Sequence, residues 1–323
     1  MSSRTLVVGC GFIGSHLVEA LSNGGRAPVV LTRSHPSPQT LGRFDNAEVV
    51  VGDASDPSIV KPLLEDVDRV VYCAGGLLPA ESNRNPVLDS LLTLEPLIGV
   101  LDALRGGRDL HLIYLSSGGT VYGEPRSLPV AETHPTDPVS IYGIMTLTGE
   151  KCVGAYCHLH GISATILRCA NVYGEHQPPQ REQGVIPMFL RAIDSDRPIT
   201  VFGDGSVIRD YVYVRDAVDV IMSVDLDKAA AEEIINVGSG QGTSLTELLS
   251  IMEEVTGKTP RVEHRPSRPF DVDRIVLDVS RMRVMASKDP TPLAEGIARC
   301  WSAVTHSPGE QGSIGEQGSI ASG

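Results

Sequence analysis

The sequence of 323 residues predicts an α/β protein: a doubly wound parallel sheet followed by a smaller α/β lobe. Short runs rich in valine, isoleucine and leucine alternate with helical patterns up to about residue 170. These runs are apolar throughout, and a glycine-rich turn follows the first of them. Continuously apolar strands are typical of a parallel sheet, because its crossover helices bury both of its faces.

The first half of the chain is therefore expected to supply most of the sheet. Strands are predicted at residues 6–8, 29–31, 49–51, 70–73, 112–116 and 164–167. Helices are predicted at residues 15–22, 91–104 and 142–158, between these strands. The resulting alternation of strand and helix is the pattern of a nucleotide-binding domain.

The second half is less regular. Strands are predicted at residues 199–202 and 234–237, and a helix at 244–256, where Ser244 and Glu247 can cap the first turn. We expect a first domain over residues 1–172 and a second over 173–304. Residues 305–323 repeat the motif Gly-Glu-Gln-Gly-Ser-Ile and are predicted to be a disordered tail, because they lack apolar side chains to bury.

Composition excludes several classes of partner. The net charge of -13 opposes binding to nucleic acid or to an anionic membrane surface. The six cysteines form no CxxC pair, so no metal site is expected. No apolar run reaches the roughly 18 residues of a membrane-spanning helix, and a cytoplasmic location is expected.

A phosphate-binding turn is predicted directly after the first strand. Gly9, Gly11 and Gly14 have GxGxxG spacing, and Phe12 and Ile13 complete the motif. Glycines at this spacing let the backbone approach a pyrophosphate at the N-terminus of the following helix. The motif predicts a Rossmann dinucleotide site; the alternative is that the glycines serve only close packing of strand and helix.

The end of the second strand bears on the choice of dinucleotide. Arg33 stands where an NAD site usually has an acidic residue, so NADP is favoured over NAD. The alternative is that Arg33 lies on the adenine ring of NAD. Asp53 either accepts a hydrogen bond from the adenine or caps its own loop. Further candidate cofactor contacts are Ala54, Ala74, Gly75 and Ser116.

Four ordered segments carry a resemblance to a known family. They are residues 114–123, 140–146, 168–174 and 202–212. With them, the chain resembles the extended short-chain dehydrogenase/reductase family over residues 4 to about 300, and is most similar to nucleotide-sugar epimerases and dehydratases of the UDP-glucose 4-epimerase kind. The resemblance implies an NAD(P)-dependent epimerase that acts on a UDP-hexose or another NDP-hexose through a transient keto sugar.

In such enzymes a tyrosine takes the proton from a sugar hydroxyl while hydride passes to the nicotinamide, and Tyr142 matches it. A tyrosine with a pKa near 10 is a poor base, and the family adds a lysine four residues later. This chain has Thr146 there, which can donate a hydrogen bond to the ribose but supplies no charge. Relatives also place a hydroxyl at Gly118; Ser117 or Thr120 can replace it, or these hydroxyls only cap the strand end.

The resemblance also implies a clamp for the sugar nucleotide. Asn171, Arg209 and Arg268 match residues that bind the diphosphate, and Asp271 lies where a ribose or sugar contact is expected. Val185 and Val201 match the shelf under the base, although core packing explains them equally well.

Two other functions stay open from the sequence. The runner-up enzyme is a 5,6-eliminating dehydratase acting on a UDP-hexosamine. The third candidate is a non-catalytic NAD(P)- or nucleotide-sugar-binding protein, because the chain has Gly118 and Thr146 where relatives have a hydroxyl and a lysine.

A homodimer is expected, since relatives pack helices equivalent to 91–104 and 142–158 into a four-helix bundle. Small residues at Gly143, Gly149, Gly154 and Ala155 are expected to permit that approach.

Overall fold

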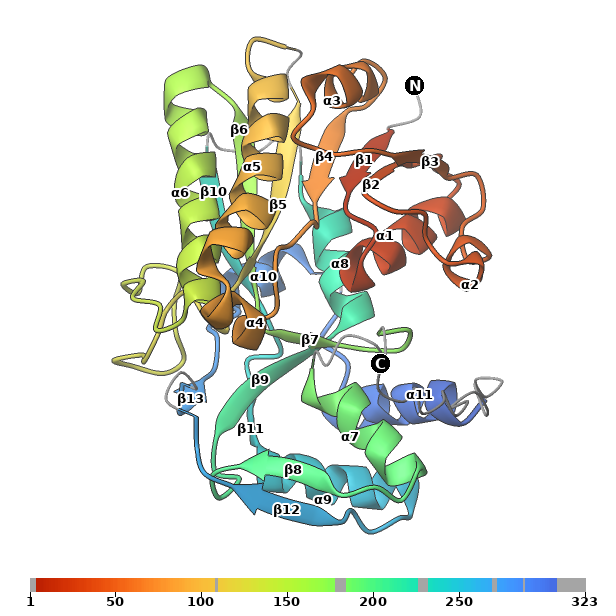
Figure 1. The fold of residues 1–323 in the computed structure, drawn as a ribbon, viewed down its shortest axis with the longest axis vertical. Helices are drawn as coiled ribbons and strands as arrows, with labels where there is room; N and C mark the ends of the chain where they lie inside the picture. The colour runs from red at the N-terminus through yellow and green to blue at the C-terminus, as the bar shows by residue number, and fades with distance from the viewer. Residues whose placement is uncertain are drawn as a thin grey trace, which may run out of the picture.

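The protein consists of a large α/β lobe with a smaller lobe below it (Figure 1). The structure is a computed structural model and describes residues 4–107, 110–177, 184–225, 232–268, 272–286 and 288–306. The large lobe contains a seven-stranded sheet in the order β10-β6-β5-β4-β1-β2-β3. All of its strand pairs are parallel, which confirms the predicted fold class.

Each of the six strands predicted for the first half overlaps a strand of this sheet. The strands are β1 (Thr5–Val8), β2 (Val29–Thr32), β3 (Glu48–Val51), β4 (Arg69–Tyr72), β5 (His111–Ser117), β6 (Ser163–Cys169) and β10 (Glu232–Val237). The predicted strand at 234–237 is part of β10, which pairs with β6 in the large sheet. The chain therefore returns to the large lobe after residue 173, and the expected boundary between residues 172 and 173 does not separate the two sheets.

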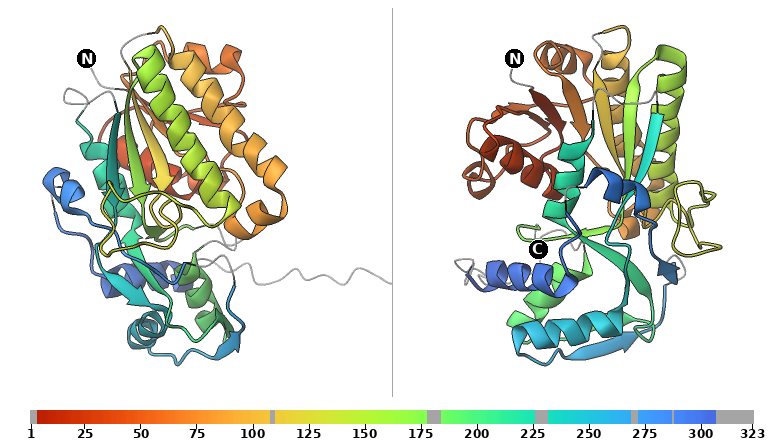
Figure 2. Two further views of the ribbon diagram at one scale, coloured as in Figure 1. Left: turned by 90° about the vertical axis from the view of Figure 1, so that its left-hand side faces the viewer. Right: turned by 180° about the vertical axis from the view of Figure 1, so that it is seen from behind.

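Helices cover both faces of the sheet (Figures 1 and 2). One face carries α3 (Pro57–Leu63), α5 (Pro86–Leu104) and α6 (Ile141–His160), and the other carries α1 (Phe12–Asn23), α8 (Val214–Ser223) and α10 (Ser280–Met285). Successive strand residues point to opposite faces: Leu6 and Val8 belong to one core cluster, and Val7 belongs to the other. Burial on both sides explains why the strands are apolar throughout.

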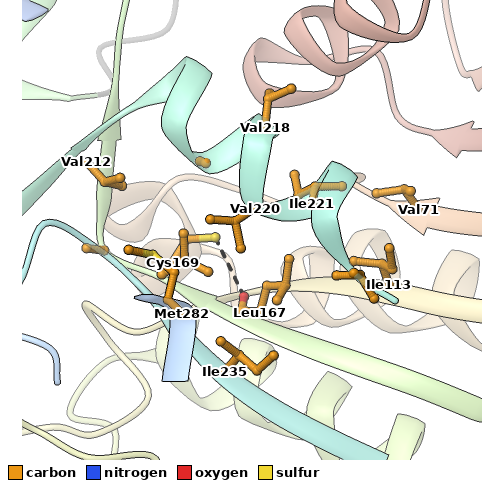
Figure 3. Packing of buried hydrophobic residues seen from close by; sticks show 14 of the residues in the cluster. Val71, Ile113, Leu167, Cys169, Val212, Val218, Val220, Ile221, Ile235 and Met282 are labelled. Carbon is orange, nitrogen blue, oxygen red and sulfur yellow. Dashed lines mark hydrogen bonds between the residues drawn. The ribbon is translucent and has the colours of Figure 1, made fainter. Parts of the chain in front are cut away.

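The face under α8 illustrates this packing. Figure 3 shows Val71 and Ile113, from β4 and β5, on the same side of the sheet as Val218, Val220 and Ile221 of α8. All five side chains are buried. Close packing of this kind holds the carboxyl ends of the central strands in fixed positions.

The smaller lobe lies at the carboxyl ends of the large sheet (Figure 1). Its strands are β7 (Asn171–Tyr173), β8 (Ile199–Phe202), β9 (Ile208–Tyr213), β11 (Gly242–Ser244), β12 (Val262–Arg265) and β13 (Arg274–Ile275), and its helices are α7 (Val185–Asp194), α9 (Leu245–Thr256) and α11 (Leu293–His306). Ser244 and Glu247 form the predicted capping box at the start of α9. Two short helices, α2 (Pro38–Leu41) and α4 (Pro79–Arg84), complete the described elements.

Three glycines of α6 do not have the predicted role. A Cβ on Gly149 would lie 2.2 Å from the hydroxyl of Tyr114, and one on Gly154 would lie 2.9 Å from the carboxylate of Glu232. A Cβ on Gly143 would meet the loop that follows β5. These glycines bring α6 close to its own lobe, so they are not on the outer face where a second subunit would pack.

Some predictions fall outside the described residues. These are Asp271 and most of the predicted tail, residues 307–323; residues 305 and 306 belong to α11.

Within the described ranges, no helix is long and apolar enough to cross a membrane. The same ranges contain no group of three or more His, Cys, Asp or Glu side chains that could hold a metal ion.

Candidate active site

The turn between β1 and α1 has the geometry of a phosphate cradle. Gly9 has a φ of 100°, and a Cβ on it would lie 2.6 Å from the main-chain nitrogen of Ala74. A Cβ on Gly14 would lie 2.0 Å from the carbonyl oxygen of Gly9. Gly11 caps α1 without a side-chain hydrogen bond, and a Cβ on it would meet no atom within 4 Å. The turn therefore combines close backbone packing with open space, which fits a dinucleotide pyrophosphate.

Phe12 and Ile13 are the first residues of α1. Their side chains pack against the cores of the smaller and larger lobes, respectively. Their amides belong to the first helical turn, which has no partner within the helix. These residues can therefore bind an anion through the main chain while their side chains anchor the turn.

The loops after β2 and β3 place Arg33 near Asp53. The Asp53 carboxylate accepts from the Ser55 amide at 2.9 Å and from the Ser55 hydroxyl at 2.8 Å. These bonds lower the pKa of Asp53, and Arg33 adds a smaller effect in the same direction. Asp53 thus caps its own loop, and its contact with adenine stays a prediction. Ala54 is buried under α5, whereas Gly75 borders open space.

Tyr142 lies in the first turn of α6. Ser140 is the N-cap, and the amide of Ile141 donates to Asn83 Oδ1 of α4 at 2.9 Å. Thr146 is buried, and its hydroxyl donates to the carbonyl oxygen of Tyr142 at 2.8 Å. These bonds fix the main chain of the helical turn that carries Tyr142, and the hydroxyl of Thr146 donates within its own helix.

A buried carboxylate lies close to this turn. Asp89 of α5 is 1% exposed and accepts from the Leu77 amide at 2.8 Å, the Ser82 hydroxyl at 2.5 Å and the Thr93 hydroxyl at 3.1 Å. A Cβ on Gly76 would lie 2.3 Å from Asp89 Oδ1. The loop that follows β4 therefore packs directly onto this carboxylate.

The surroundings of Tyr142 favour its neutral form. Burial raises the pKa of Tyr142, Asp89 raises it further, and the Thr146 hydroxyl lowers it. Among the described residues, no lysine or arginine contributes to this shift. The missing lysine is therefore not replaced by another cation from that part of the chain.

The buried cation of β6, Arg168, is already paired. Arg168 Nη2 lies 2.6 Å from Glu150 Oε2, and the two side chains are 3% and 2% exposed. The guanidinium also lies 4.9 Å from the centroid of the Tyr122 ring. The hydroxyl of Ser116 donates to Glu150. The proton of this hydroxyl is consequently used by Glu150, so toward a cofactor the side chain of Ser116 can act only as an acceptor.

The loop after β5 has no room for the side chain that relatives place at Gly118. A Cβ there would lie 2.7 Å from Leu277 Cδ1. Thr120 lies against the first turn of α6, because its carbonyl oxygen would be 3.0 Å from a Cβ on Gly143. Of the two candidate hydroxyl residues, Thr120 has its main chain beside the helical turn that carries Tyr142, and its hydroxyl donates to the carbonyl oxygen of Ser117 at 3.4 Å.

Ser117 and Asn171 both lie near Gly119. The Cβ position of Gly119 is 4.0 Å from Ser117 Oγ and 3.8 Å from Asn171 Nδ2. Asn171 Nδ2 donates to the carbonyl oxygen of Asp210 in β9 at 3.0 Å. Asn171 therefore links the loop after β5 to the strand that carries the first clamp arginine.

The two predicted clamp arginines come from separate segments of the smaller lobe. Arg209 Nη1 donates to the carbonyl oxygen of Ile208 at 2.9 Å. The Arg268 guanidinium lies 4.5 Å from the centroid of the Phe202 ring, so an arginine and an aromatic face meet at the end of β8.

The predicted base shelf is only partly available. Val201 is 1% exposed and belongs to the core of the smaller lobe with Ile186 and Phe189. Core packing therefore accounts for the side chain of Val201, and its contact with a base stays a prediction. Val185, the first residue of α7, is half-buried.

Three buried carboxylates were not predicted from the sequence. Asp89, Glu150 and Asp210 are each 1–2% exposed. Asp210 accepts from the amides of Ser239 and Gly240 at 2.8 and 3.1 Å. Glu150 and Asp210 stand next to Lys151 and Arg209 in the sequence, so the local pattern does not distinguish these carboxylates from solvated ones.

Comparisons with known proteins agree with this arrangement. Residues 5–238 match the NAD dependent epimerase/dehydratase family. The chain is 34% identical to the UDP-glucose 4-epimerase of Mycolicibacterium smegmatis over 92% of its length and 96% of that relative.

Two crystal structures share the fold. The UDP-glucose 4-epimerase of Thermotoga maritima with UDP-glucose has 30% identity and a TM-score of 0.86, covering 94% of this chain and 98% of that one. The UDP-glucose 4-epimerase of Thermus thermophilus in complex with NAD has 30% identity and a TM-score of 0.85, covering 94% and 99%. Since fold, glycine turn and family match coincide, this chain belongs to the NAD dependent epimerase/dehydratase family, as an NAD-dependent nucleotide-sugar epimerase similar to UDP-glucose 4-epimerases.

Proposed function

We propose that the protein interconverts C4 epimers of a UDP-hexose through a transient keto sugar, with Tyr142 as the proton-transfer group. The observation that supports this most directly is the position of Tyr142 in the first turn of α6, beside the loop that carries Thr120. UDP-glucose is the sugar nucleotide bound to the similar Thermotoga maritima enzyme.

The large lobe holds the dinucleotide in this proposal. Gly9, Gly11 and Gly14 shape the cradle, and the amides of Phe12 and Ile13 bind the pyrophosphate. The nicotinamide, when bound, supplies reversible acceptance of a hydride. Every proton movement is left to the protein, and Tyr142 takes and returns the proton of the sugar hydroxyl.

Hydroxyl groups and the clamp orient the sugar nucleotide. Thr120, or Ser117 from the other side of the loop, donates a hydrogen bond to the sugar oxygen. Asn171, Arg209 and Arg268 bind the diphosphate, for which forked guanidinium donors are suited. Residues 1–172 thus bind mainly the dinucleotide, and residues 173–304 mainly the sugar nucleotide, although β10 of the second segment belongs to the large sheet.

We also propose that NADP binds better than NAD. Arg33 is exposed at the end of β2, where it can pair with a 2'-phosphate. Arg33→Asp is expected to reverse this preference, measured as the ratio of dissociation constants for the two dinucleotides. An unchanged ratio in the variant would remove Arg33 from the dinucleotide site.

The catalytic proposal is tested with the purified protein and UDP-glucose, UDP-galactose or their N-acetyl forms. Interconversion of C4 epimers is followed by nuclear magnetic resonance, and mass spectrometry identifies ligands released on denaturation. Tyr142→Phe should abolish turnover while sugar-nucleotide binding persists, whereas Arg209→Ala should weaken binding. Loss of water from the sugar would instead identify the 5,6-dehydratase. Binding without any turnover would identify a binding protein.

A further inference from the structure

The loop between β4 and α4, residues 73–78, borders the dinucleotide cradle. A Cβ on Gly9 would lie 2.6 Å from the main-chain nitrogen of Ala74, so the loop packs directly against the glycine turn. A Cβ on Gly75 would meet no atom within 4 Å, and the same is true of Gly11 in the turn. Each of the two segments therefore has a main-chain position that a ligand can approach closely.

One buried side chain, Asp89 in the first turn of α5, holds this loop in place. Asp89 is 1% exposed, and its Oδ1 atom accepts from the Leu77 amide at 2.8 Å. A Cβ on Gly76 would lie 2.3 Å from the same oxygen. Hydrogen bonds to an ionised group are roughly twice as strong as those between neutral groups, so a carboxylate holds the loop firmly. The loop is thus fixed at Gly76 and Leu77, next to the open position at Gly75.

The other carboxylate oxygen of Asp89 holds α4. Asp89 Oδ2 accepts from the hydroxyl of Ser82 at 2.5 Å, and both side chains are buried. The next residue of α4, Asn83, accepts from the amide of Ile141 at 2.9 Å. Ile141 is the first residue of α6, and Tyr142 is the second. A single carboxylate therefore connects the loop beside the cradle to the short helix that contacts the start of α6.

We propose that Asp89 is a positioning residue, which fixes the loop after β4 relative to the turn of α6 that carries Tyr142. Hydride transfer and proton transfer occur at the same sugar carbon and its oxygen, so the dinucleotide and the phenol must be held in register. Asp89 acts through hydrogen bonds to the loop and to α4. This inference rests on the proposed function, because it assumes that a dinucleotide fills the cradle and that Tyr142 transfers the proton.

Dinucleotide affinity tests the support of the loop without turnover. Dissociation constants of NAD and NADP are measured by calorimetry for the purified full chain. Asp89→Asn keeps an acceptor for Leu77, and the Ser82 hydroxyl can turn to accept, so the Kd should stay within about threefold of wild type. Asp89→Leu has the same branching but no acceptor and should raise the Kd about tenfold. Asp56→Ala removes two hydrogen bonds at the start of α3, away from the loop, and should leave the Kd unchanged.

A second variant displaces the loop and leaves Asp89 intact, so the test does not depend on the folding of Asp89→Leu. Gly76→Ala places a methyl group against Asp89 Oδ1 and the Thr93 hydroxyl, which are 2.3 and 2.1 Å from the Cβ position. The loop must move away from its support, and the Kd should again rise about tenfold.

Turnover tests the connection to α6. Asn83→Leu removes the acceptor of the Ile141 amide and should lower kcat about tenfold at saturating dinucleotide, with an unchanged Kd. Asp89→Leu should both lower kcat and raise the Kd, whereas Asp89→Asn should have neither effect.

Each part of the proposal has its own contrary result. A wild-type Kd in Asp89→Leu and Gly76→Ala would overturn the support of the loop. A wild-type kcat in Asn83→Leu would overturn the connection to α6. A tenfold rise of the Kd in Asp89→Asn would overturn the hydrogen-bonding role, because that variant keeps its acceptor for the loop. Failure of the wild-type protein to bind either dinucleotide would overturn the proposed function as well.

Discussion

At the scale of single residues, charge balance distinguishes this site from the pattern of its family. Tyr142 stands at the predicted position, but Asp89 acts on it and Thr146 contributes only a hydroxyl. The sequence shows that a lysine is absent. It does not show that Arg168, a possible substitute, is already paired with Glu150.

The pH dependence of epimerisation should report this balance. Burial and Asp89 raise the pKa of Tyr142, so the fraction of phenolate at neutral pH is small and the rate should rise with pH throughout the range in which the protein is folded. Thr146→Lys lowers the pKa of Tyr142, because a cation stabilises the phenolate. The variant should be about tenfold faster at neutral pH and reach its plateau at lower pH. Identical pH–rate profiles for the two proteins would contradict this account.

The buried pair of Arg168 and Glu150 should matter for stability. Arg168→Leu leaves a buried carboxylate without its partner and is expected to lower the free energy of unfolding by about 3–5 kcal/mol. Urea denaturation measures the change. Arg105→Gln, which breaks an exposed 3.7 Å pair with Asp102, should cost less than about 1 kcal/mol. Equal effects of the two substitutions would show that burial does not determine the contribution of these pairs.

At the scale of elements, the turn between β1 and α1 is specified almost entirely by local sequence. The GxGxxG spacing predicts the turn, and the structure adds the reason for each glycine: two positions have no space for a Cβ and one has ample space. The two kinds of glycine therefore have separable effects.

A matched pair of alanine substitutions separates packing from binding. Gly14→Ala places a methyl group against the carbonyl oxygen of Gly9 and should lower the free energy of unfolding by about 1–3 kcal/mol. Gly11→Ala meets no protein atom within 4 Å, so stability should be nearly unchanged. It should nevertheless weaken dinucleotide binding, because the open space is where the pyrophosphate is expected. Thermal unfolding and calorimetric titration measure the two effects; full affinity in Gly11→Ala would place the dinucleotide elsewhere.

At the scale of the whole molecule, the outer face of α5 and α6 is the proposed dimer surface. Leu91, Ile98, Ile144 and Leu159 are exposed by 51, 37, 41 and 69%, respectively. Figure 2 shows the two helices side by side on the outside of the sheet. Apolar side chains on neighbouring helices suit packing against a second copy.

Disruption of this surface should produce monomers. Leu91→Glu places a charge on the proposed interface and is expected to give a monomer at micromolar concentration, as measured by sedimentation. Val284→Glu changes a valine that is 88% exposed on α10, away from this surface, and should leave the dimer intact. A wild-type protein that sediments as a monomer would exclude the assembly.

The sequence by itself determined the features that depend on local patterns: apolar runs, the glycine turn and the capping box of α9. Each follows from residues close together in the chain, where periodicity and backbone conformation act directly. These patterns sufficed to predict the fold class and the dinucleotide cradle.

Only the tertiary structure decided which distant residues meet. It placed β10 beside β6, turned the glycines of α6 toward their own lobe, and buried Val201 and the hydroxyl of Ser116. It also brought Asp89 next to the start of α6 and neutralised Arg168. Such contacts depend on how helices cross between strands and on which donors a buried charge finds, and neither is encoded in the spacing of any single segment.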